Sequence, residues 1–166
     1  MNAIGFRCST NYCIMSIVKC EEKEILLLDE IIMPKFLNKP EQLNHLRLIV
    51  SDFIELFSIN YAGIKTIELK SKNKNIERVE YELILQELLT NHGIENILMG
   101  RNTSIASALG LNRYELSNII NKKQEFSHLS NWKLISDFKS KISKKNEMSE
   151  AVLVAYCSFL GGCNYE

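Results

Sequence analysis

The chain has 166 residues, of which 46% are hydrophobic and 24% are charged, and its 20 lysines and arginines are matched by 20 aspartates and glutamates. This balance fits a single globular domain and excludes a disordered chain or a strongly basic one. No apolar run approaches the roughly 20 residues that span a bilayer, and the N-terminus lacks the pattern of a secretory signal. Five cysteines without a CxxC pair predict reduced thiols, so we expect a cytoplasmic protein.

The first part of the sequence predicts three consecutive strands. Apolar and β-branched runs at 3–7 and 12–20 surround turn residues at 9–11, which is typical of a hairpin. A third apolar run at 24–33 ends at Pro34. We therefore expect an antiparallel meander.

Helices and strands then alternate. Apolar residues recur at three- and four-residue steps over 40–57 and 76–92, which predicts two amphipathic helices. The runs 63–69 and 94–99 predict two further strands. Strands joined through helices in this order form a parallel half-sheet with right-handed crossovers. The sequence thus predicts an α/β fold of order β-β-β-α-β-α-β, with a five-stranded mixed sheet, flanking helices and a helical C-terminal part.

The C-terminal part contains a basic region within what we interpret as one domain, 1–166. Helices are predicted over 103–109, 113–121, 130–142 and 146–160. The insertion 101–145 carries nine basic residues against three acidic ones. This asymmetry is compatible with a phosphate-facing surface, and a solvated helical face is the alternative. The residues expected to contact nucleic acid are Arg101, Arg113, Lys122, Lys123, Lys141, Lys144 and Lys145.

Residues 103–121 resemble the helix-turn-helix unit of repressor-type regulators. Ala106 is small where the two helices would cross, Gly110 falls where the turn needs a left-handed backbone, and Leu116 would pack back on the first helix. Repressor units have a helix just before this pair, whereas 94–99 predicts a strand, and such pairs also occur as packing elements. If the pair reads DNA, the side chains facing the bases are Asn112, Arg113, Tyr114, Ser117 and Asn118.

Two acids, Glu147 and Glu150, stand at the start of the last predicted helix. Positions three apart share a helix face, so both carboxylates point the same way. Such a pair can hold a divalent metal if a third acid approaches, and Glu68 in the strand 63–69 is the candidate. Alternatively, both are first-turn glutamates that interact with the helix dipole.

Together, the meander, the alternating helices and strands and the late acidic helix resemble the RNase H-like superfamily, and its RuvC resolvase branch in length and order. Members carry one acid in the first strand, one at the end of the fourth and one or two in the last helix. The resemblance implies Glu68, Glu147 and Glu150 as catalytic carboxylates. Arg7, however, stands where the first-strand aspartate is expected.

An arginine at this position removes a metal ligand and adds a positive charge in its place. We therefore expect a degenerate site in which Arg7 pairs with these glutamates and no metal cofactor is needed. The resulting hypothesis is a nuclease-inactive RuvC-like module, a pseudoenzyme that binds nucleic acid or a protein partner. Two alternatives stay open: a DNA-binding regulator that uses 103–121, and a Mg²⁺- or Mn²⁺-dependent nuclease with an altered carboxylate set.

Overall fold

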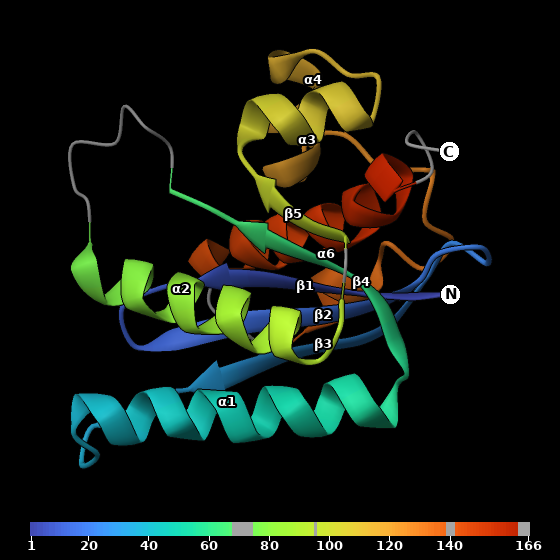
Figure 1. Ribbon diagram of the computed structural model, residues 1–166. Coiled ribbons are helices and arrows are strands. Elements are labelled where there is room, and N and C mark those ends of the chain that lie inside the picture. Colours follow the sequence, from blue (N-terminus) through green and yellow to red (C-terminus); the bar gives the residue numbers. More distant parts are fainter. Residues whose placement is uncertain (68–74, 95, 139–141, 163–166) are drawn as a thin grey trace.

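A mixed sheet between two helical layers forms the molecule (Figure 1). The computed structural model describes residues 1–67, 75–94, 96–138 and 142–162. The sheet has five strands in the order β3-β2-β1-β4-β5, so the predicted α/β architecture is confirmed. The strands are β1 (Asn2–Cys8), β2 (Tyr12–Lys19), β3 (Glu24–Ile32), β4 (Ile59–Lys65) and β5 (Asn96–Gly100).

The pairing of the strands places three of their carboxyl ends together. β1, β2 and β3 form the predicted antiparallel meander, whereas β4 runs parallel to β1 and β5 runs parallel to β4. The ends of β1, β4 and β5 therefore meet at one edge of the sheet. Crevices outside the carboxyl ends of parallel strands are common ligand sites.

Helices cover both faces of the sheet (Figure 1). On one face, α1 and α2 enclose a core that contains Phe6, Ile64 and Leu85. On the other face, α6 and the shorter helices enclose a second core that contains Ile14 and Val152. The helices are α1 (Lys39–Leu56), α2 (Ile76–Asn91), α3 (Asn102–Ala108), α4 (Arg113–Ile120), α5 (Leu134–Asp137) and α6 (Ile142–Gly162). No helix among the described residues is long and apolar enough to cross a membrane.

Two glycines let α6 lie directly on the sheet. Gly5 of β1 and Gly63 of β4 are partners in the parallel register. A Cβ added to Gly5 would lie 2.1 Å from the carbonyl oxygen of Ala151, and one added to Gly63 would lie 2.2 Å from that of Val154. Only glycine permits this approach of helix backbone to sheet, so the two positions fix the distance and place of α6.

Strand β4 begins four residues earlier than predicted. Ser58 has a φ of +49° directly after α1, and pairing with β1 starts at once with Ile59 opposite Asn2. The left-handed residue turns the chain directly into the sheet, and the strand extends over Ile59–Lys65. Glu68, which we expected inside the strand, lies outside the described residues.

The helix predicted over 130–142 is also wrong in extent, because of the described residues 130–138 only Leu134–Asp137 is helical. Before α5, the chain is held against the edge strand β3. The Asn131 side chain accepts a hydrogen bond from Ile25 N at 2.7 Å and donates one to Ile25 O at 2.8 Å. This contact competes with helix formation, since short polar side chains stabilise non-helical backbone when they bond backbone groups.

The last helix begins at Ile142, four residues before the predicted start. Glu147 and Glu150 therefore lie beyond its first turn, which contains no acid. The interpretation of these residues as first-turn glutamates is wrong, because the helix dipole acts only within the first turn.

Candidate functional site

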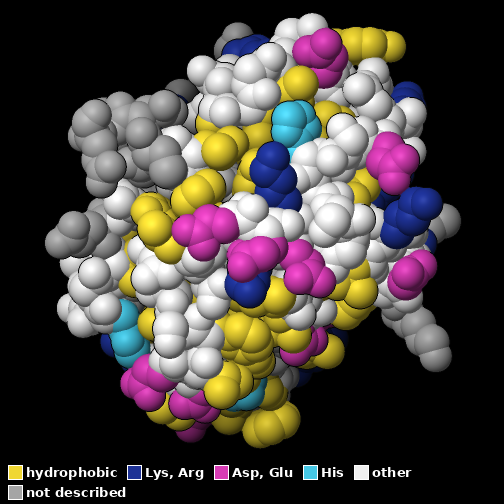
Figure 2. All heavy atoms as spheres, turned by 90° about the vertical axis from the view of Figure 1, so that its right-hand side faces the viewer, with side chains coloured by type: hydrophobic (Ala, Val, Ile, Leu, Met, Phe, Trp, Pro, Cys, Tyr) yellow, Lys and Arg dark blue, Asp and Glu magenta, His cyan; other side chains and the backbone are white. Residues whose placement is uncertain are grey.

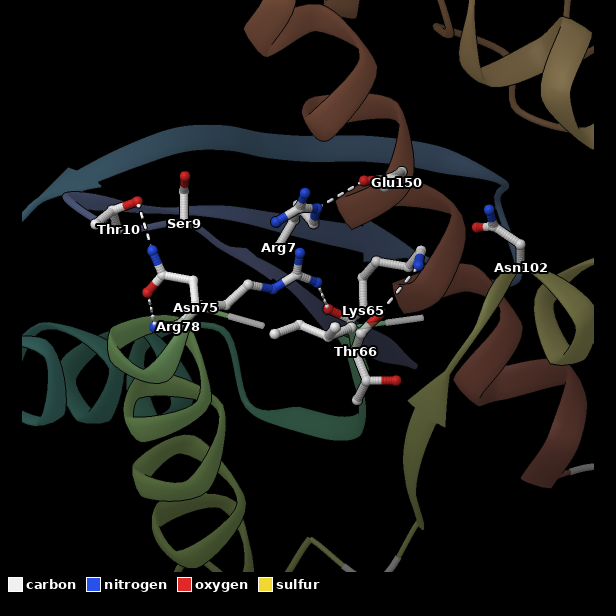
Figure 3. A pocket seen from close by; sticks show the side chains of 10 residues that line it. Arg7, Ser9, Thr10, Lys65, Thr66, Asn75, Arg78, Asn102 and Glu150 are labelled. Carbon is white, nitrogen blue, oxygen red and sulfur yellow. Dashed lines mark hydrogen bonds and ion pairs between the residues drawn. The ribbon is translucent and has the colours of Figure 1, made fainter. Parts of the chain in front are cut away.

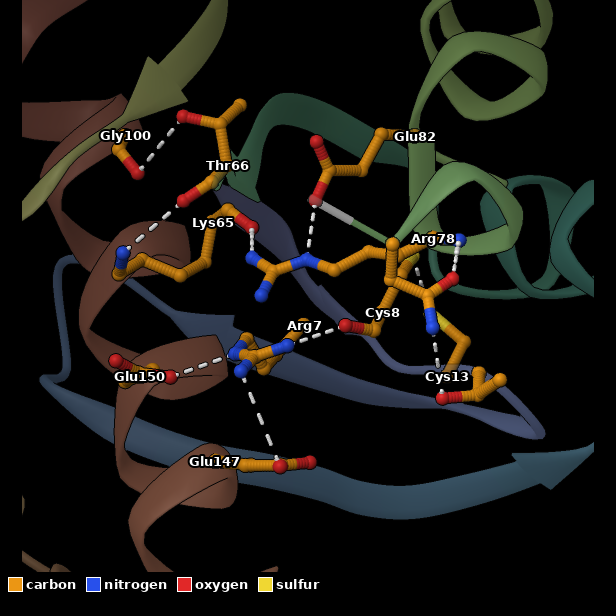
Figure 4. Close-up of polar contacts among 12 residues, drawn as sticks. Arg7, Cys8, Cys13, Lys65, Thr66, Arg78, Glu82, Gly100, Glu147 and Glu150 are labelled. Carbon is orange, nitrogen blue, oxygen red and sulfur yellow. Dashed lines mark hydrogen bonds and ion pairs between the residues drawn. The ribbon is translucent and has the colours of Figure 1, made fainter. Parts of the chain in front are cut away.

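Charged side chains from β1 and α6 meet at the carboxyl end of β1 (Figure 4). Arg7 Nε donates to Glu150 Oε2 at 2.7 Å, and Arg7 Nη2 lies 3.9 Å from Glu147 Oε1. The guanidinium also donates from Nη1 to the carbonyl oxygen of Cys8. The structure thus brings three of the four residues of the suspected site together.

The glycine contact explains this meeting. Gly5 and Arg7 are two positions apart on β1, so both face α6. Ala151 and Ala155 lie over Gly5, and the preceding turns of α6 carry the glutamates to Arg7. Helix and strand therefore run in opposite directions across each other.

The ion pair is largely withdrawn from solvent. The side chains of Arg7, Glu147 and Glu150 are 16%, 19% and 15% exposed. Burial on its own lowers the pKa of the Arg7 guanidinium, but the charges of Glu150 and Glu147 outweigh it and hold the pKa above its ordinary value. Arg7 consequently stays protonated, and its attraction to the carboxylates is stronger than at a wet surface.

Two further cations lie across from Arg7 (Figure 4). Lys65 ends β4 and is 3% exposed, and its Nζ donates to the Thr66 carbonyl at 3.1 Å. Arg78 of α2 donates from Nε to Glu82 at 2.6 Å and from Nη2 to the Lys65 carbonyl at 2.9 Å. Neither residue was among the site residues predicted from the sequence. The signals were a lysine closing an apolar strand and an Arg-Glu pair four residues apart on a helix.

A hollow of about 270 Å³ opens between these cations (Figure 3). Its lining comes from the β1–β2 turn, the end of β4 and the starts of α2 and α3, and from α6. A second hollow of about 280 Å³ reaches α4 and shares the lining residues Asn102 and Glu150 with the first, and we call these two neighbouring hollows the groove. The first is lined by Arg7, Ser9, Thr10, Lys65, Thr66, Ile67, Asn75, Arg78, Asn102 and Glu150. The second is completed by Thr103, Arg113, Leu116, Ser117, Ile120 and Asn121.

The basic residues predicted to contact nucleic acid, where the structure describes them, have different surroundings. Arg113 lines the groove, whereas Arg101 is exposed just before α3. Lys144 pairs with Glu30, and Lys145 donates to the Ser136 carbonyl at 3.2 Å. Lys141 lies outside the described residues.

Lys122 and Lys123 line a separate hollow of about 290 Å³ beside Trp132. The Lys122 ammonium sits 4.4 Å from the centre of the Trp132 ring, a cation–π distance. Burial, and then the charge of Lys145, lowers the pKa of Lys122 to about 8.

Figure 2 shows the end of the molecule that lies opposite the carboxyl ends of β1 and β4. On this face, Lys and Arg side chains are interspersed with Asp and Glu. The groove, by contrast, lies at the carboxyl ends of β1 and β4.

The helix pair α3–α4 is present at nearly the predicted boundaries. Gly110 has a φ of +65° in its turn, and Ala106 and Leu116 are buried as the motif requires. The exposed side chain of Asn112 caps α4, since its Oδ1 accepts hydrogen bonds from Tyr114 N and Glu115 N. The pair packs on α6, with α3 directly following β5.

The described residues do not fit a divalent metal. They contain no group of three or more His, Cys, Asp or Glu side chains that could hold one. Glu147 and Glu150 face the Arg7 guanidinium instead, whose charge opposes a cation at the same place.

Solved structures identify the fold. Two structures of Thermus thermophilus RuvC match, one described alone (10% identity, TM-score 0.72) and one in complex with a Holliday junction substrate (8% identity, TM-score 0.71). Each match covers 99% of this chain and 96% of the other. No protein-family model matches the chain, and no curated protein sequence matches it. At such low identity the likeness shows the fold alone, and the predicted RNase H-like, RuvC-like fold is confirmed.

Proposed function

We propose that this chain, which has the fold of RuvC resolvases, is a nuclease-inactive module that binds nucleic acid along the groove at its strand ends. The contact between Arg7 Nε and Glu150 Oε2 at 2.7 Å carries the proposal. It puts a cation at the strand end where related nucleases carry a metal-binding acid.

The electrostatic cost explains why metal chemistry is disfavoured. Two unit charges 4 Å apart interact by about 4 kcal/mol at the effective dielectric of a protein surface, and a divalent ion doubles this repulsion. A metal among Glu147, Glu150 and Arg7 would also have to replace the guanidinium as partner of both carboxylates.

Nucleic acid is the favoured ligand because cations line both hollows at the strand ends. Arg7, Lys65 and Arg78 line one hollow, and Arg113 lines the other. Phosphate contacts by Lys and Arg supply most of the affinity of non-specific nucleic-acid binding. One of the matched RuvC structures is in complex with a Holliday junction, which supports the same class of ligand.

Binding is tested with fluorescein-labelled single-stranded, duplex and four-way-junction DNA and with RNA, by anisotropy in EDTA. We expect affinity that falls with salt, and a slope that decreases by about one for Arg113→Ala. Arg47→Ala, which breaks the exposed pair between Arg47 of α1 and Glu87 of α2, is the matched control and should bind as the wild type. Absence of binding at low salt would contradict the proposal and favour a protein partner.

Inactivity is tested with branched DNA and RNA–DNA hybrids in Mg²⁺ or Mn²⁺. We expect no cleavage. Robust cleavage that disappears in Glu68→Gln would overturn this part of the proposal and favour a nuclease with an altered carboxylate set.

A second candidate function is sequence-specific DNA reading by α3–α4. The observation in its favour is the outward face of α4, where Arg113 and Ser117 are exposed and Tyr114 is 75% exposed. Selection from a random duplex library should then return one sequence, whose preference is lost in Tyr114→Ala and Arg113→Ala. Recovery of unrelated sequences would exclude sequence-specific reading and leave non-specific nucleic-acid binding as the remaining candidate function.

A further inference from the structure

We infer that the hollow at the end of β4 is a phosphate-binding pocket that works without a metal ion. The inference deepens the proposed function and rests on it only for the source of the phosphate. Its ligand class is a phosphate group, either free or carried by a nucleic-acid strand.

Three cations from three separate elements face this hollow (Figure 3). Arg7 comes from β1, Lys65 from β4 and Arg78 from α2. Glu150 is the acid among the described lining residues. Glu147 and Glu82, which contact Arg7 and Arg78, do not line the hollow. Among the described lining residues the cations therefore outnumber the acids, while Glu147 and Glu82 hold the guanidinium groups from outside this lining.

Arg78 is fixed in place and still has donors to offer. A guanidinium has five N–H groups in a rigid fork that matches phosphate oxygens. Arg78 uses one at Nε for Glu82 and one at Nη2 for the Lys65 carbonyl. Its remaining N–H groups have no hydrogen-bond partner among the described residues, so a phosphate can be bound without breaking either contact.

The rest of the lining suits a small anion. Ser9, Thr10, Thr66 and Asn75 supply hydroxyl and amide groups, and the Asn75 side chain donates to Thr10 Oγ1 at 3.3 Å, which ties the start of α2 to the β1–β2 turn. The volume of about 270 Å³ is below the range of about 300–1,000 Å³ typical of pockets for larger organic ligands. The polar walls and this size favour a phosphate group over a whole apolar ligand.

Inorganic phosphate is the first probe, titrated calorimetrically in EDTA against chloride at equal ionic strength. We expect phosphate to bind the wild type, and Lys65→Met and Arg78→Gln to weaken binding at least about tenfold, the loss expected for one charge-assisted hydrogen bond. Arg47→Gln is the matched control and should stay within about twofold. Equal heats for phosphate and chloride, or unchanged affinity in both pocket variants, would overturn the inference.

The Arg78 variant leaves Glu82, a 6% exposed acid, without its partner. The double variant Arg78→Gln/Glu82→Gln removes both charges and so avoids an unpaired buried carboxylate. Circular dichroism should show it folded. Loss of phosphate binding in this folded protein supports the pocket, and wild-type affinity in it counts against the pocket.

Oligonucleotides with a 5′-phosphate, a 3′-phosphate or hydroxyl ends distinguish the sources. A gain of about tenfold or more from one terminal phosphate, lost in Lys65→Met, assigns the pocket to a strand end. Equal affinity for all three, with inorganic phosphate as competitor, assigns it to an internal phosphodiester.

Failure of the two proposals can be told apart. Oligonucleotide binding that depends on Arg113 but not on Lys65 or Arg78, with no response to phosphate, removes the pocket and leaves the proposed function. Phosphate binding that depends on Arg78, without binding of any nucleic acid, removes the proposed function and leaves a pocket for a small phosphate.

Discussion

The contact between α6 and the sheet has two ends, one formed by closely packed backbone and the other by long charged side chains. At Gly5 and Gly63 the helix backbone touches the strands, and a single added carbon would overlap a carbonyl oxygen. Two positions further along β1, Arg7 reaches Glu150 through a long side chain and a hydrogen bond. At the glycine end, the fold depends on the absence of side-chain atoms between helix and sheet. At the Arg7 end, the side chains could be replaced by others of different charge without a change in the backbone. The difference shows how a fold can persist while its site changes character.

The largest effect is expected at the glycine end. Gly5→Ala should lower the free energy of unfolding by about 3 kcal/mol or more, because the new Cβ meets helix backbone that cannot rotate away. Urea unfolding followed by circular dichroism measures it. Gly161→Ala, with open space around the position, is the control and should be neutral or stabilise by up to about 1 kcal/mol. Equal effects of the two substitutions would contradict the comparison.

Removal of the cation at the charged end should have the next largest effect. Arg7→Leu leaves Glu147 and Glu150 withdrawn from solvent without their partner, and we expect a loss of about 2–3 kcal/mol in the same assay, less than for a fully buried pair. Arg47→Leu at the exposed pair with Glu87 should cost about 1 kcal/mol or less. A loss for Arg7→Leu no greater than that of the control would show that the ion pair contributes little.

Replacement of the positive charge of Arg7 by a negative one should convert the ion-pair site into a metal-binding site while the fold is kept. Arg7→Asp places a third carboxylate beside two others, so the variant should be destabilised in EDTA and recover in Mn²⁺. At a metal concentration 100 times the Kd, the gain is about 2.7 kcal/mol. Thermal unfolding with and without Mn²⁺ measures this gain, and the wild type should show none. A variant indifferent to Mn²⁺ would mean that the glutamates are not placed to share a metal.

Lys122 gives the smallest effect and a contrast to Arg7, since it has no carboxylate partner among the described residues. Burial lowers its pKa from 10.5 to about 8 in the folded state, so the folded protein resists protonation of this group. The resulting destabilisation is fully present below pH 8 and vanishes above about pH 10.5. Lys122→Met should therefore raise stability at pH 7, and the gain should shrink between pH 8 and 10.5. A gain that does not vary with pH would exclude titration of Lys122 as its cause.

The sequence was a good guide to the order of elements and a poor one to their register. Alternating apolar runs predicted the strands and their sequence, but one residue, Ser58, shifted β4 by four positions. The apolar pattern continues on both sides of the start of this strand, so it does not show at which residue the strand begins. The segment 130–142 failed for another reason, since the side chain of Asn131 makes tertiary contacts that local propensity does not contain.

Part of the candidate site was visible in the sequence for a physical reason. Spacing along one helix predicted that Glu147 and Glu150 share a face, and the family pattern singled out Arg7. Lys65 and Arg78 were missed because their proximity depends on how α2 packs beside the end of β4. Contacts between elements of this kind follow from the assembled sheet and not from a repeat along the chain.

The clasp of Asn131 on Ile25 has a consequence for how this molecule meets other chains. An outermost strand presents unpaired amide and carbonyl groups that can recruit a foreign strand and start aggregation. The carboxamide of Asn131 imitates a peptide unit, taking the amide and the carbonyl of the same residue on β3. A strand from another molecule therefore cannot form backbone hydrogen bonds with Ile25 unless it displaces the Asn131 side chain.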